Sequence, residues 1–130
     1  MRKLDNVVLL MARARILRRA LQREERLLLR RTEGRTITLA EGWPWVTYFN
    51  LYLANVHVLI ERWDHEMFYD EDVAQAATPS VRRCLKRIRN AVFHAGPFND
   101  RDITDAWEKY PDRRQDADAI LESVSRFVKR

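Results

Sequence analysis

The stretch WPWVTYFNLYLANVHVLI at residues 43–60 contains no charged side chain. Its 18 residues approach the length of a helix that spans a bilayer. It nevertheless includes Pro44 and four polar side chains, at Thr47, Asn50, Asn55 and His57. We therefore predict no membrane span but a buried central helix, which begins near Pro44 and reaches about Met67, with the proline in its first turn.

One stripe of this helix is polar. Thr47, Asn50, His57 and Glu61, with Ala54 between them, follow each other at steps of three and four residues and so share one face. A polar seam on a central helix must be hydrogen-bonded or must line a wet cleft. The alternative is that His57 and Glu61 form only an i,i+4 pair at the rim of the core.

The flanking segments also have the period of amphipathic helices. Residues 3–31 combine an apolar stripe with many arginines, residues 68–78 are acidic with one helical turn at most, and Thr78 before Pro79 is typical of a helix start. That helix is expected to reach His94, with Val81, Leu85, Ile88, Val92 and Phe93 toward the core. A short helix over 102–109 and a last one over 113–129 complete the pattern. The sequence predicts an all-α, four- to five-helix bundle with a long basic N-terminal helix, in a single domain of residues 1–130.

Composition narrows the class of protein. The chain has 3 Gly and 4 Pro, too few for many short strands. Its N-terminal residues do not follow the pattern of a secretory signal, and the single cysteine, Cys84, suits a reducing compartment. We expect a cytoplasmic protein in which Cys84 is a small packing residue.

Positive charge gathers in two segments. Residues 1–35 hold 11 Lys and Arg against 4 Asp and Glu, and residues 79–101 hold 6 against 1. Such patches attract a phosphate backbone without regard to sequence. On the helix that starts at Pro79, the candidate RNA-binding residues are Arg82, Arg83, Lys86 and Arg87. Alternatively, the acidic segment at residues 36–78 neutralises the basic ones.

The chemistry-bearing motif lies at the end of that helix. The sequence has no zinc-binding Cys/His spacing, no phosphate-binding Gly-rich loop and no HExxH or GxSxG motif. What remains is Arg89-Asn90-Ala91-Val92-Phe93-His94. Asn90 and His94 are one turn apart on one face, whereas the long Arg89 side chain has to bend round to join them. Histidine suits acid–base work near neutral pH, and arginine suits a charged phosphate.

This string resembles the "RNxxFH" form of the HEPN family of helical nucleases, and residues 48–97 look like the two central helices of that family. The resemblance implies a homodimer in which two motifs form one cleft that cuts single-stranded RNA without a metal or cofactor. It implies catalytic roles for Arg89, Asn90 and His94, and more loosely a supporting one for Glu61. His57 and Asn50, which share the polar stripe with Glu61, are further candidates for a supporting role. Members of the family act as toxins or in phage defence, which implies an antitoxin or regulatory protein as a further partner.

Two other functions remain open. A catalytically inactive module of the same fold would use the basic first helix, Arg13 to Arg30, to bind nucleic acid or an acidic protein. A small helical subunit would use exposed aromatic residues, such as Trp43, Trp45 and Trp107, as an interface with another chain.

Overall fold

The computed structural model describes residues 2–33, 39–93 and 112–130, which form five α-helices and no strand. The helices are α1 (Lys3–Thr32), α2 (Leu39–His65), α3 (Glu71–Ala76), α4 (Pro79–Phe93) and α6 (Arg113–Lys129). The predicted all-α fold is confirmed. The short helix expected at 102–109 lies outside the described residues.

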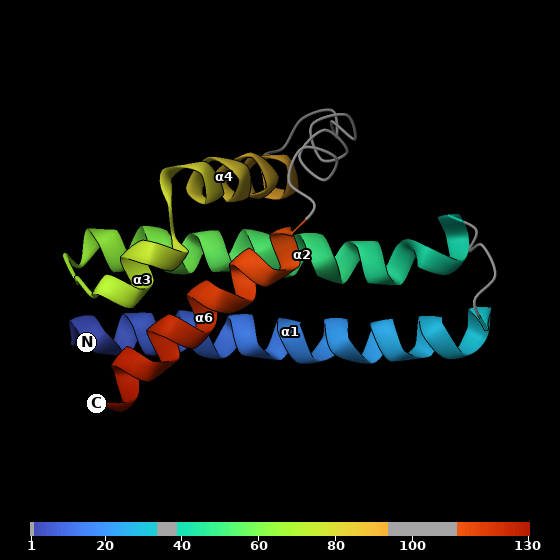
Figure 1. Cartoon of the computed structure of the whole chain (residues 1–130), viewed down its shortest axis with the longest axis horizontal. Coiled ribbons are helices and arrows are strands. Elements are labelled where there is room, and N and C mark those ends of the chain that lie inside the picture. The colour runs from blue at the N-terminus through green and yellow to red at the C-terminus, as the bar shows by residue number, and fades with distance from the viewer. Residues whose placement is uncertain (1, 34–38, 94–111) are drawn as a thin grey trace.

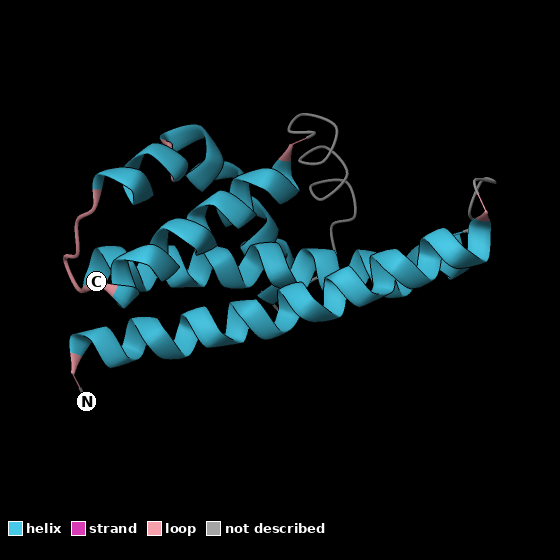
Figure 2. Cartoon of the chain, turned by 60° about the horizontal axis from the view of Figure 1, so that its bottom comes forward, coloured by secondary structure: helices cyan, strands magenta, loops and turns pink. Residues whose placement is uncertain are grey.

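The long helices α1 and α2 run side by side in opposite directions (Figure 1). Helix α4 packs on the side of α2 that faces away from α1, and α6 crosses α1 and α2 obliquely (Figures 1 and 2). At the C-terminal end of α1 and the N-terminal end of α2, these two helices extend past the other described helices (Figure 1). Helix α2 is therefore the centre of the bundle.

This central position explains why α2 is apolar on most sides. Its middle side chains are at most 1% exposed at Tyr52, Leu53, Ala54, Val56, Leu59 and Ile60. Trp63, near the end of the helix, meets Phe127 of α6 edge to face at 4.9 Å between ring centroids. The predicted buried central helix is confirmed. None of the described helices has the length and apolar character needed to cross a membrane.

The start of α2 differs from the prediction. The helix begins at Leu39, so that Pro44 lies inside it rather than in its first turn. A proline lacks the N–H that would bond to the carbonyl of Ala40, but this removes a single bond near the helix end. After the proline, the ring of Trp45 stacks on that of Phe49 at 5.1 Å between ring centroids. The helix ends at His65, shortly before Met67 takes a left-handed conformation (φ 62°).

The helix α4 begins as predicted. The hydroxyl oxygen of Thr78 accepts a hydrogen bond from the Val81 N–H at 3.3 Å, which satisfies one of the free donors of the first turn. Leu85 and Ile88 are buried against α2. The expectation that Phe93 faces the core is wrong, because this ring is 50% exposed. It lies 100° round the helix from Val92, beyond the face that packs on α2.

Candidate active site between α2 and α4

Arg89 is held against α2 by an acidic side chain. Its Nε lies 3.3 Å from Oε1 of Glu61, a residue 28 positions earlier in the chain. The guanidinium lies back toward α2 because the Glu61 carboxylate compensates its charge, and the side chain stays 30% exposed.

The same carboxylate oxygen also contacts His57, and Arg89 contacts its neighbour. His57 Nε2 lies 3.2 Å from Glu61 Oε1, one turn away on the same helix. Arg89 Nη1 donates to Oδ1 of Asn90 at 3.0 Å. Four residues that the sequence singled out thus form one connected cluster, in which Glu61 is the bridge between α2 and α4. The i,i+4 pair of His57 and Glu61 is present, but it is part of this larger contact.

His57 is the buried member of the cluster, with 7% of its surface exposed. Burial lowers its pKa, and the charges of Arg89, Lys86 and Arg82 lower it further, against the opposing effect of Glu61. At neutral pH the ring is therefore uncharged, and its Nε2 lies 3.2 Å from Oε1 of Glu61. Its Nδ1 is buried without a hydrogen-bond partner. Because so little of the ring reaches solvent, it is placed to contact Glu61 rather than a molecule that binds from solvent.

This burial makes stability sensitive to mild acid. Between the lowered pKa of His57 and the usual value of about 6.5, the unfolded chain binds more protons than the folded chain. The free energy of unfolding is therefore expected to decrease as the pH falls below about 6.5. Urea unfolding at pH 7.5, 6.5 and 5.5, with NMR titration of the His57 ring, measures this. His57→Gln should flatten the profile, and a titration midpoint at or above 6.5 would contradict the assignment.

The other candidate residues lie apart from this cluster or beyond the described chain. Asn50 is 7% exposed, and its Oδ1 is buried without a hydrogen-bond partner. It precedes His57 by two helical turns, about 10 Å along the axis. Thr47 is exposed, and its hydroxyl donates to the Trp43 carbonyl at 3.0 Å. His94, the proposed acid–base group, lies outside the described residues.

The basic residues of α4 do not all have the same surroundings. Arg82 donates from Nε to the Ala77 carbonyl at 2.8 Å and pairs through Nη1 with Asp64. Arg83, Lys86 and Arg87 are exposed. Because Arg82 is already neutralised by a carboxylate, Arg83 and Lys86 are better placed than Arg82 to bind RNA.

A groove borders the cluster on the α1 side of α2. It has a volume of about 330 Å³ and is lined by Leu10, Val58, Glu61, Arg62 and His65. The side chain of Glu61 is 46% exposed, and it both lines this groove and contacts Arg89. The ion-paired cluster is thus reachable from solvent at its bridging residue.

Sequence reasoning missed a second polar network, which fixes α6 across α1 and α2. Arg114 of α6 pairs with Glu25 of α1 at 2.8 Å and with Asp118 at 3.3 Å. The Tyr52 hydroxyl donates to Asp118 at 2.5 Å, and Arg18 pairs with Glu122 at 2.6 Å. Partners up to 104 residues apart leave no local pattern that could have revealed them.

The described residues contain no group of three His, Cys, Asp or Glu side chains placed to hold a metal ion. Cys84 is fully buried in α4, and burial raises the pKa of its thiol. The interpretation of Cys84 as a packing residue is confirmed.

Comparisons of the chain with protein-family models, with curated proteins and with solved structures gave no match in any of the three.

Proposed function

We propose that this chain is a metal-independent endoribonuclease of the HEPN type that cleaves single-stranded RNA, acting as a homodimer with a site shared between two copies of α4. The observation that carries the proposal is the connection of Arg89, Asn90, Glu61 and His57 in one cluster between α2 and α4. These residues come from the motif and from the polar stripe, two separate features of the sequence. Their contact gives the arginine of the motif a fixed position.

The contacts of Arg89 leave part of its guanidinium available. Of its five N–H donors, Nε–H faces Glu61 and one Nη1–H is donated to Asn90. The three other donors, on the terminal nitrogens, have no partner among the described residues, and they are enough for a bidentate contact with a phosphate. The Nε side of the guanidinium is thus fixed by Glu61, while donors on the terminal nitrogens can contact a phosphate. An arginine fixed in this way is preorganised to stabilise negative charge that develops on the phosphate, as electrostatic catalysis requires.

The reaction is a transesterification in which the RNA supplies the nucleophile. A base, His94 in one copy, takes the proton of the ribose 2′-hydroxyl, and the 2′-oxygen forms a bond to phosphorus. The P–O5′ bond breaks, and the leaving 5′-oxygen takes a proton from the second histidine of the shared site. Arg89 stabilises the extra negative charge of the phosphorane-like transition state. The products are a 2′,3′-cyclic phosphate and a 5′-hydroxyl.

The test is an assay of the purified full chain with a single-stranded RNA oligonucleotide in EDTA. We expect cleavage products that end in a 2′,3′-cyclic phosphate, and light scattering should give twice the 15.6 kDa mass of one chain. Cleavage that requires added divalent metal would contradict the mechanism. Binding of RNA by a dimer that never cleaves it would favour the catalytically inactive module instead.

A further inference from the structure

Four arginines form a stripe along the outer face of α1. Arg19, Arg23, Arg26 and Arg30, here called the arginine stripe, are all exposed. At 100° per residue their side chains leave the helix within a sector of about 60°, and they extend over about 16 Å of its axis. They thus form one narrow, straight row of positive charge.

No described carboxylate neutralises this row. None of its four side chains has an ion pair within the described part of the chain. Between residues 19 and 30 the acidic residues are Glu24 and Glu25. Glu25 pairs with Arg114 of α6, and Glu24 leaves the helix at least 100° away from any arginine of the stripe. By contrast, the nearby Arg18 lies toward α6 and pairs with Glu122. The fold therefore pairs its inward arginine and leaves the outward ones available.

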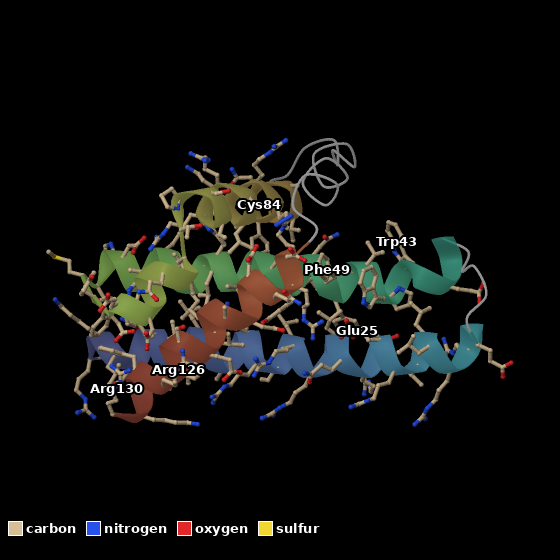
Figure 3. The ribbon with its side chains drawn as sticks, in the orientation of Figure 1. Glu25, Trp43, Phe49, Cys84, Arg126 and Arg130 are labelled. Atoms are coloured by element: carbon tan, nitrogen blue, oxygen red, sulfur yellow. The ribbon has the colours of Figure 1, made fainter. Side chains whose placement is uncertain are left out.

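The stripe and the candidate active site lie on opposite sides of the molecule. Helix α2 lies between α1 and α4 (Figure 1). Figure 3 shows a row of nitrogen-tipped side chains on α1 that point away from α2, whereas those of α4 point the other way. One protomer therefore presents two separate basic surfaces, and the stripe is too remote to belong to the Arg89 cluster.

The chemistry of the stripe favours a duplex phosphate backbone over a single strand. The guanidinium group contacts phosphate oxygens through a fixed fork. Over about 16 Å, one strand of a duplex presents roughly five phosphates. Helix α1 has no aromatic residue, and its exposed apolar side chains, Leu4, Leu9, Ile16 and Leu29, are aliphatic. It therefore lacks the stacking surface on which single-stranded nucleic acids are usually bound.

We infer that the arginine stripe is a second nucleic-acid site, which binds the phosphate backbone of a double-stranded nucleic acid without reading its sequence. This site does not depend on the proposed cleavage, because binding at α1 would persist whether or not the Arg89 site is active. In a cleaving protein it would retain a structured region of the substrate on the face opposite the reacting strand.

The experiment measures binding as a function of salt in an Arg89→Ala background, so that the RNA stays intact. The probes are a 16-base-pair RNA duplex, a DNA duplex of the same sequence, a 16-nucleotide single strand and polyglutamate. The stripe variant is R19Q/R23Q/R26Q. The matched control, K3Q/R126Q/K129Q, removes the same charge from exposed side chains elsewhere. Circular dichroism checks that both stay helical, which glutamine favours.

We expect the stripe variant to bind either duplex at least about tenfold more weakly at 100 mM salt. The slope of log affinity against log salt should become less steep by about 2 to 3, since each lost phosphate contact on a duplex removes about 0.9. The control should change the slope by less than about 1. Equal binding of the two duplexes indicates recognition of phosphate alone, whereas preference for one identifies which of them is bound. Equal losses in both variants, tighter binding of the single strand, or polyglutamate binding as strong as that of the duplexes would overturn the inference.

Discussion

Replacing Arg89 by alanine is expected to lower the rate of RNA cleavage by about 100- to 1000-fold, the usual effect of removing one preorganised charge-stabilising donor. The loss should appear in kcat, because Arg89 acts on charge that develops in the transition state. The fold should survive, since the side chain is partly exposed and pairs with a Glu61 carboxylate that is 46% exposed. An ion pair of this kind contributes no more than about 1 kcal/mol.

The matched control is Arg126→Ala, which removes an exposed arginine of α6 far from the cluster in sequence. Its cleavage rate should stay within about twofold of the unmodified chain. Added methylguanidine should restore part of the activity to Arg89→Ala, because the missing group is then supplied from solution. Full activity of Arg89→Ala, with unchanged circular dichroism, would exclude the Arg89 site as the place of cleavage.

In this mechanism Glu61 positions Arg89. Substituting Glu61 therefore tests the placement of the guanidinium separately from its charge. Glu61→Gln keeps the size of the side chain but removes the charge that holds Arg89. We expect a smaller loss of activity than for Arg89→Ala, without rescue by methylguanidine, because the guanidinium is still present but no longer fixed. The pKa of His57 should fall further in this variant, since Glu61 is the group that raises it. The NMR titration of His57 reports this even if activity does not change.

A second large effect is expected on stability, when a core side chain is truncated. Leu53→Ala is expected to lower the free energy of unfolding by about 2 to 5 kcal/mol, because Leu53 is fully buried in α2 and its loss leaves a cavity. The same substitution at Leu9, which is 57% exposed on α1, should cost less than about 0.5 kcal/mol. Urea unfolding followed by circular dichroism measures both. Similar costs for the two variants would contradict the central position of α2.

The sequence alone predicted much of the helical architecture, because the signals for helices are local. The end helix over 113–129 agrees with α6 (Arg113–Lys129), and the Thr78 cap marks the start of α4. These features depend on the repeat of apolar residues and on contacts a few positions apart. Pro44 was misplaced because a local rule puts proline in the first turn, whereas the helix begins at Leu39 and the proline removes only one hydrogen bond near the helix end.

The sequence also showed the polar stripe of α2 and the motif that begins at Arg89, but it did not show that residues of the two are in contact. The Glu61–Arg89 contact and the network of Arg114, Glu25, Asp118 and Tyr52 join residues from different helices. Which charges meet depends on how α4 and α6 lie against α2, and packing over many side chains determines this. The sequence by itself therefore determined the helices and the residue types available for chemistry. Only the tertiary structure decided that Glu61 holds Arg89, and that the arginines on the outer face of α1 have no partner among the described residues. The reason is that ion pairs between helices depend on distances that no local pattern encodes.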